Sequence, residues 1–172
     1  MVAGMPIIGS MMKQISKQIL TMLAFVLPLL GPLPPATAQS MVTLIVTDPL
    51  TGIALYGMDP VSYFTEPAPL VGESDFELVW QNAPWHFASA ANRDVFEKSP
   101  EIYAPQFGGH GAMGVARGFL SDSDPAMYAV FKQRLYLFYS ADSREAFLLS
   151  PDAAAREAEA RWPELSKRLS IQ

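Results

Sequence analysis

Cysteine is absent from this 172-residue chain, and basic residues are few. Without a thiol the chain forms no disulfide, no thiolate metal site and no cysteine nucleophile, and it carries no lipid on an N-terminal cysteine. It has 12 Lys and Arg against 17 Asp and Glu, a formal net charge of −5. Phosphate binding needs clustered basic side chains, so we expect no nucleic-acid partner. Half of the residues are hydrophobic and only 17% are charged, which predicts a folded chain with a real core.

Familiar catalytic signatures are also missing. The chain has neither a Gly-x-Ser-x-Gly nucleophile elbow nor a His-Glu-x-x-His zinc helix. The acidic pair Asp122 and Asp124 lies in a Ser/Asp/Pro-rich turn, where such side chains normally cap the turn in solvent. We therefore expect a protein that is not an enzyme.

The N-terminal segment has the three parts of a secretory signal peptide. Lys13 and Lys17 precede an apolar run at 19–30, and Ala36-Thr37-Ala38 supplies small residues at the −3 and −1 positions. We predict a cleavable signal peptide at 1–38 and a mature chain that starts at Gln39. The protein is then expected in the periplasm or secreted.

A retained membrane helix is the alternative to cleavage. A span needs about 20 apolar residues, whereas Pro28 and Pro32 interrupt this run early, so we expect no membrane anchor after cleavage. The stretch before Met11 is apolar and uncharged, unlike an ordinary n-region. Met1, Met11 and Met12 therefore stay open as the true start.

The mature segment, 39–172, is predicted as a single domain, and no internal repeat is recognised in it. Apolar runs joined by short polar turns predict hairpins, and Ser or Asp before helical patterns predicts N-caps. Together these elements predict an α+β fold, a small antiparallel sheet built from hairpins and covered by several short helices. The expected strands are 41–47, 76–80, 85–88, 127–131 and 135–139, and the expected helices are 60–64, 90–98, one starting at Asp142, and 151–163.

A glycine-rich segment at 107–114 holds four glycines in eight residues. Such a segment lets the backbone approach a ligand or a packed helix closely. It lacks the Lys-Ser/Thr ending of a phosphate loop. We predict a positive φ for at least one of Gly108, Gly109 and Gly111.

Five blocks of the mature chain resemble the exported branch of the YHS-domain family, in the same order along the chain. The resemblance covers nearly all of 39–172 and implies a small YHS-like α+β fold. The blocks are Gly-Met-Asp-Pro-Val-Ser-Tyr-Phe (57–64), Trp-His-Phe-Ala-Ser-Ala-Ala-Asn-Arg-Asp-Val-Phe (85–96), Tyr-Ala-Pro-Gln-Phe-Gly-Gly (103–109), Leu-Tyr-Leu-Phe-Tyr (135–139) and Trp-Pro (162–163).

Short YHS domains are thought to bind metal through cysteines, and the resemblance places those cysteines at positions that hold other residues here. Ser62 occupies the cysteine position of the first block, and Ala88 and Asn92 occupy the two cysteine positions of the second block. Gly111 occupies the cysteine position that follows the double glycine. These residues cannot form a soft thiolate site. The resemblance therefore implies the scaffold without its presumed metal ligands.

The remaining candidates for metal ligands are His86, His110 and Met113. Imidazole and thioether ligands suit copper, which an exported protein can meet, so copper is the cofactor we consider, although nothing in the sequence requires one. The alternative is that His86 and His110 are satisfied structural residues and Met113 belongs to the core.

Aromatic residues in the family-like blocks predict a small apolar pocket beside the glycine segment, with a hydrophobic core as the alternative. The function we expect is that of a small exported binding or accessory protein of YHS type, which binds a small ligand or an envelope protein. Copper or other transition-metal binding and a purely structural interaction module are the alternatives. The predicted pocket residues are Tyr63, Trp85, Phe87, Tyr103, Phe107, Gly108, Gly109 and His110.

Overall fold

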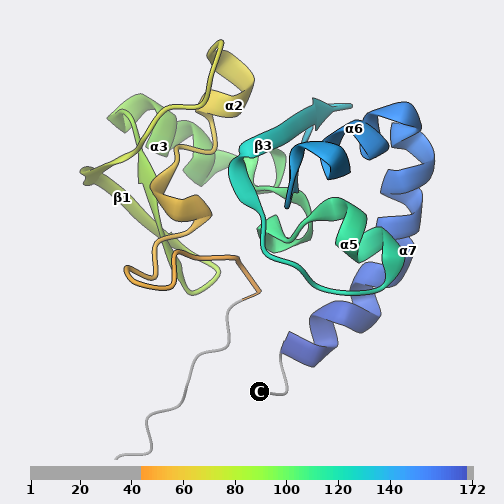
Figure 1. Cartoon of the computed structure of the whole chain (residues 1–172). Helices are drawn as coiled ribbons and strands as arrows, with labels where there is room; N and C mark the ends of the chain where they lie inside the picture. Colours follow the sequence, from red (N-terminus) through yellow and green to blue (C-terminus); the bar gives the residue numbers. More distant parts are fainter. Residues whose placement is uncertain (1–43, 170–172) are drawn as a thin grey trace, which may run out of the picture. The chain divides into compact units, whose positions relative to one another are not determined.

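The computed structural model describes residues 44–169, all of which lie in the compact unit Ser40–Gln172. The predicted signal peptide and the three alternative starts fall outside the described residues. The α+β fold is confirmed, with two antiparallel hairpins that form separate two-stranded sheets, and several helices (Figure 1). No described helix is long and apolar enough to cross a membrane. The elements are η1 (Leu55–Gly57), α2 (Ser62–Thr65), β1 (Glu73–Trp80), β2 (Ala83–Phe87), α3 (Ala90–Lys98), α4 (Pro100–Tyr103), η2 (Gln106–Gly109), α5 (Ala112–Arg117), β3 (Asp124–Phe131), β4 (Arg134–Phe138), α6 (Ala141–Leu149) and α7 (Pro151–Leu169).

The first hairpin, β1–β2, turns tightly at Gln81 and Asn82, whose φ angles are 49° and 61°. Two successive positive φ values are typical of the turn whose twist matches that of paired strands. The register then shifts at a bulge between Glu73 and Glu77. The hairpin leads directly into α3, whose N-cap Ser89 accepts a hydrogen bond from the Asn92 amide, as predicted.

The second hairpin and the helix that follows it repeat the first hairpin and α3, whereas α7 has 19 residues and its counterpart α4 has four. β3–β4 has strands of the same lengths, the same two-residue turn with positive φ, and a bulge at the same place in the ladder. Helix α6 has the same length as α3 and begins at the N-cap Ser140, 51 residues after Ser89 (140 − 89 = 51). Both helices end at a serine that is followed by a proline, Pro100 or Pro151, at the start of the next helix.

The segment in front of each hairpin is repeated as well. Its two copies are 52 residues apart in sequence, whereas the two N-cap serines are 51 residues apart. Leu55, Tyr56 and Gly57 have positive φ, and so do Phe107, Gly108 and Gly109, 52 residues later (107 − 55 = 52). The short helices α2 and α5 follow these turns. The described part of the chain thus contains an internal structural repeat, which we divide into the first repeat (residues 55–103) and the second repeat (residues 107–169). The expectation of no internal repeat was wrong.

Each repeat packs a cluster of aromatic residues at corresponding positions. Trp85, Phe87 and Phe96 lie in one cluster, and Tyr136, Phe138 and Phe147, each 51 residues later, lie in the other. All six side chains are at most 2% exposed. In each repeat the helix after the hairpin therefore packs a phenylalanine from the corresponding position, Phe96 or Phe147, against its sheet.

Three local predictions need correction. Of the strand predicted at 41–47, the described part forms only an isolated bridge from Thr47 to Ala54. Ser140, rather than Asp142, caps α6. Pro163 does not end the last helix, which continues to Leu169 because residues on both sides of the proline, Trp162 and Leu165, pack into the second cluster.

Candidate functional site

A buried carboxylate organises the first repeat. Asp59 is fully buried and follows the turn at 55–57. Its Oδ1 accepts hydrogen bonds from the backbone amides of Val61 (2.8 Å) and Ser62 (3.4 Å), at the start of α2. Its Oδ2 accepts from the amide of Ala88 (2.9 Å) and the Nδ2 of Asn92 (2.6 Å), at the start of α3. The carboxylate therefore joins the beginnings of two helices, where negative charge is favourable.

The Ser62 hydroxyl completes this arrangement. It donates to the Asp59 carbonyl oxygen (2.6 Å) and accepts from the Leu70 amide (2.9 Å). Ser62, Ala88 and Asn92 are three of the positions at which the YHS resemblance implies cysteine, and the structure brings all three to the same carboxylate. Hydrogen bonds thus connect three of the four positions where the resemblance implies metal ligands.

The corresponding place in the second repeat is Gly111. The Gly111 amide donates to the Ser121 carbonyl oxygen (3.0 Å), just as the Asp59 amide donates to that of Leu70 (2.9 Å). Tyr139 corresponds to Ala88, and Ser143 corresponds to Asn92. Because Gly111 has no side chain, the second repeat has no carboxylate at this place.

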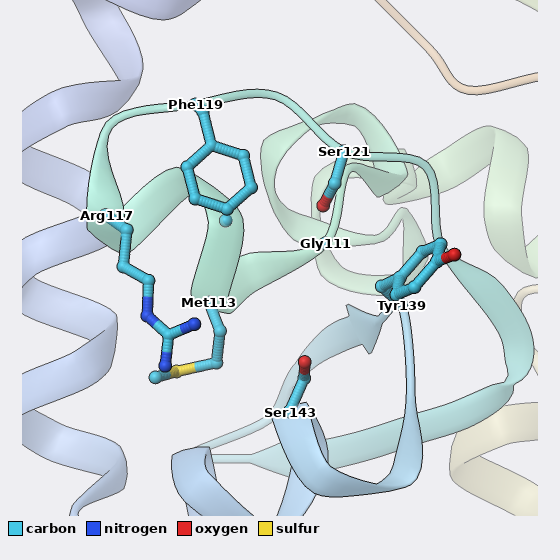
Figure 2. Close-up of a pocket in the computed structure, with 8 residues that line it drawn as sticks. Gly111, Met113, Arg117, Phe119, Ser121, Tyr139 and Ser143 are labelled. Carbon is cyan, nitrogen blue, oxygen red and sulfur yellow. The ribbon is translucent and has the colours of Figure 1, made fainter.

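A pocket of about 190 Å³ lies at this position (Figure 2). The side chains of Phe119 and Tyr139 at the pocket are 50% and 70% exposed. A Cβ atom on Gly111 would stand only 2.6 Å from Ser121 Oγ, so this hydroxyl would have to move before a side chain could stand there. The Tyr139 nitrogen lies 3.5 Å from the same point. The lining residues are Gly111, Met113, Gly114, Arg117, Phe119, Ser121, Tyr139 and Ser143.

The pocket combines polar groups with an apolar side. In Figure 2 the Ser121 hydroxyl points into the pocket. Met113 and the ring of Phe119 line another part of the pocket, close to the Arg117 side chain. Within residues 44–169, Arg117 makes no ion pair and the Ser121 hydroxyl has no hydrogen-bond partner. Arg117 is the only lining residue with a full charge. The site therefore offers one free cation and a free hydroxyl beside an apolar wall.

The predicted aromatic pocket residues are divided between the two clusters. Trp85 and Phe87 are fully buried in the first cluster, and Tyr103 packs against it. Tyr63 also belongs to that cluster, where its hydroxyl donates to the Pro125 carbonyl oxygen (2.8 Å). Burial raises the pKa of the Tyr63 hydroxyl well above its ordinary value, which keeps it a neutral donor. Phe107 belongs to the second cluster.

The glycine segment packs closely against the chain, and its predicted backbone conformation is confirmed. Gly108 and Gly109 have φ angles of 62° and 89°. A Cβ atom on Gly108 would come within 1.9 Å of the Leu44 carbonyl oxygen, while Phe107 and Gly108 border an open cleft with Trp162. Gly108 thus allows a close backbone approach, as expected of the glycine-rich segment.

The two histidines have different neighbours. His86 Nε2 lies 3.2 Å from the Glu77 carboxylate within the first hairpin. His110 stacks against Trp162, with ring centroids 5.9 Å apart, and its buried Nδ1 has no hydrogen-bond partner. Burial lowers the pKa of His110, although the nearby Ser121 backbone and the Asp122 carboxylate oppose this shift. In the described part of the chain, no group of three or more His, Cys, Asp or Glu residues could hold a metal ion.

Of the predicted metal ligands, only Met113 lines the Gly111 pocket. Sequence reasoning missed Arg117, Ser121, Tyr139 and Ser143 as site residues. The pattern Ser-Ala-x-x-Arg-x-x-Phe-x-x-Ser-Pro occurs at 89–100 and again at 140–151, and this repetition could have pointed to Ser143 as the counterpart of Asn92. The other three residues lie outside the pattern.

Comparisons of the chain with family models, with curated proteins and with solved structures find no match. The YHS resemblance therefore stays a prediction that rests on the five sequence blocks.

Proposed function

We propose that this chain is an exported, non-enzymatic binding protein of YHS type, which takes up a small ligand in the Gly111 pocket. The observation that carries the proposal is the difference between the repeats. The first repeat fills the space between its helix starts with the Asp59 side chain, whereas the second has a pocket there.

The composition of the pocket supports binding rather than catalysis. Its eight lining residues include no carboxylate, imidazole or lysine, which are the usual proton-transfer groups near neutral pH. An unpartnered hydroxyl and guanidinium beside Met113 and Phe119 are instead the mixture of a few polar groups and an apolar wall that small-molecule sites show.

The size of the pocket limits the ligand. Pockets that hold drug-sized ligands have volumes of roughly 300–1,000 Å³, more than the 190 Å³ present here. A water molecule takes up about 30 Å³ of the liquid, so the pocket holds roughly six waters or a ligand of a few heavy atoms. Only part of a nucleotide or of an extended cofactor could therefore lie inside it.

A fragment titration of the purified full-length chain tests the proposal. Small carboxylates, amines and neutral polar molecules are titrated separately, and the backbone amide signals are followed by NMR. We expect at least one class to shift the signals of Gly111, Ser121 and Tyr139.

The matched variants are Ser143→Leu, which fills the pocket, and Glu145→Leu, which adds the same side chain at an exposed position of the same helix. Binding should be lost in the first variant and kept in the second. The proposal is wrong if no class shifts these signals, or if the filled pocket binds as well as the wild type.

A further inference from the structure

The first repeat holds a carboxylate group at the place that corresponds to the Gly111 pocket of the second repeat. In the first repeat the group between the two helix starts is a carboxylate, which is fully buried and accepts four hydrogen bonds from neutral donors. The fold around Gly111 repeats this backbone arrangement but provides no carboxylate of its own. We propose that the Gly111 pocket binds a small monocarboxylate, seated where the second repeat lacks the counterpart of the Asp59 side chain. This inference rests on the proposed function and names its ligand class.

The donors of the first repeat have counterparts in the second. The Ala88 amide, which donates to Asp59, corresponds to the Tyr139 amide, which borders the space in front of Gly111. The Asn92 side chain, which also donates to Asp59, corresponds to Ser143, whose hydroxyl lies at the pocket and 3.2 Å from the Ser140 hydroxyl, where either group can be the donor. A bound carboxylate can therefore accept hydrogen bonds from the same two positions that hold the Asp59 carboxylate.

Two further groups distinguish the second repeat, and both favour an external anion. Ser121 replaces Leu70, and its hydroxyl lies 2.7 Å from where a Cβ atom on Gly114 would stand. Gly114 in turn replaces Ser62, so Ser121 supplies a hydroxyl close to the place where the first repeat has its own. Arg117 adds a guanidinium with no partner in the described chain, and guanidinium groups bind carboxylates in a planar, two-pronged geometry.

The rest of the lining sets the form of the ligand. The volume of about 190 Å³ and the apolar contacts of Met113 and Phe119 suit a short aliphatic tail. A single cationic side chain matches a single negative charge better than it matches a phosphate dianion. Propionate is therefore a suitable probe, and propionamide has the same shape without the charge.

The experiment compares propionate, propionamide and propylamine by NMR titration of the full-length chain, with ionic strength held constant by chloride. We expect propionate to shift the amide signals of Tyr139 and Gly111 in a saturable way and the other two probes to leave them unchanged. Arg117→Gln should weaken propionate binding about tenfold or more, because hydrogen bonds to charged groups are the strong ones. Arg156→Gln, an exposed arginine on α7 that does not line this pocket, is the matched control.

A second pair of variants tests the effect of a carboxylate attached to the chain at residue 111. Gly111→Asp with Ser121→Ala places a carboxylate on the chain where the ligand would sit and removes the hydroxyl that a Cβ atom would meet. We expect this variant to lose propionate binding, and Ser121→Ala alone to keep a measurable part of it. If the double variant does not fold, Arg117→Gln, at an exposed position, still decides the question.

The outcomes separate the two proposals. Equal binding of propionate and propionamide, or unchanged propionate affinity in Arg117→Gln, overturns the carboxylate inference. Binding of only neutral or cationic probes at the pocket also overturns it but leaves the proposed function standing. If no probe of any class binds there, both proposals fail.

Discussion

At the scale of single residues, Asp59 shows how the chain holds a buried charge with neutral groups alone. Three backbone amides and one side-chain amide donate to its two oxygens. Burial of an ionised carboxylate is costly unless such bonds replace its water. The same bonds satisfy donors at the starts of α2 and α3, which would otherwise lack partners. Removal of the carboxylate therefore affects both helices.

We expect Asp59→Ala to lower the free energy of unfolding by about 3 kcal/mol or more, because each buried donor left without a partner costs about 1–3 kcal/mol. Urea denaturation measures the change. The control is Asp75→Ala, at an exposed position of β1, which should change stability by less than about 0.5 kcal/mol. Similar small effects of both substitutions would show that water or other groups readily replace the Asp59 carboxylate.

Gly108 and Gly52 separate two reasons for which a position requires glycine. Both have positive φ, but a Cβ atom on Gly52 would meet nothing within 4 Å, whereas one on Gly108 would overlap the Leu44 carbonyl oxygen. Gly52→Ala should therefore cost about 1 kcal/mol for its backbone conformation alone.

We expect Gly108→Ala to cost clearly more than that, because backbone at residue 44 must also move. Thermal melts of the two variants compare the costs. A Gly108→Ala variant as stable as Gly52→Ala would contradict the close approach to Leu44.

At the scale of elements, local patterns predicted the hairpins and most helix starts, but contacts between distant segments decided the rest. Alternation of apolar residues and the Ser89 cap are local signals, so β1, β2 and α3 were predicted well. The strand expected at 41–47 has the residues of a strand, yet residues 44–47 make only one bridge. Strand formation needs a partner along its length, which the sequence of the strand itself does not specify.

The candidate site was only partly predictable, for a related reason. The aromatic residues predicted to line one pocket are divided between two clusters, and of the predicted metal ligands only Met113 lines the Gly111 pocket. The positions where the resemblance implies cysteine in the first repeat, Ser62, Ala88 and Asn92, do converge in space. The Gly111 pocket becomes visible only when the repeats are compared, and the two segments that matter most, 59–64 and 111–116, share no residue when aligned. These two segments have similar backbone conformations but different side chains. Inspection of the sequence therefore did not reveal that they correspond.

Helix α7 provides a test of how tertiary packing overrides a local signal. Pro163 lies inside the helix, where a proline removes one backbone hydrogen bond and crowds the preceding turn. Packing of Trp162 and Leu165 into the second cluster maintains the helix through it. We expect Pro163→Ala to raise the free energy of unfolding by about 1–3 kcal/mol, because alanine restores the bond and has the higher helix propensity.

Pro151→Ala is the matched control for this helix. Pro151 stands at its first turn, where the missing N–H has no helical partner to lose, so stability should change little. Urea denaturation with circular dichroism measures both variants. A loss of stability in Pro163→Ala would show that the proline ring itself contributes to the packing.

At the scale of the whole molecule, the proposed function requires that the unit with the two repeats reach the cell envelope or the medium. Both basic residues of the 1–38 segment, Lys13 and Lys17, precede its apolar run, and the segment contains no acidic residue. All 17 acidic residues therefore lie in the part that would be released. Their excess over the basic residues suits an exported protein that does not bind to an anionic membrane surface.

Processing of this segment is the last prediction. Cleavage requires small residues at −3 and −1 but tolerates variety at −2, so Ala36 and Ala38 are the restricted positions and Thr37 is not. We expect the intact mass of exported protein to correspond to a chain that begins at Gln39. Ala38→Leu should block cleavage at this site and leave the precursor in the membrane fraction, whereas Thr37→Leu should be processed normally. Wild-type protein that keeps Met1 or Met11 in the membrane fraction would contradict the signal peptide, and equal processing of both variants would place the cleavage site elsewhere.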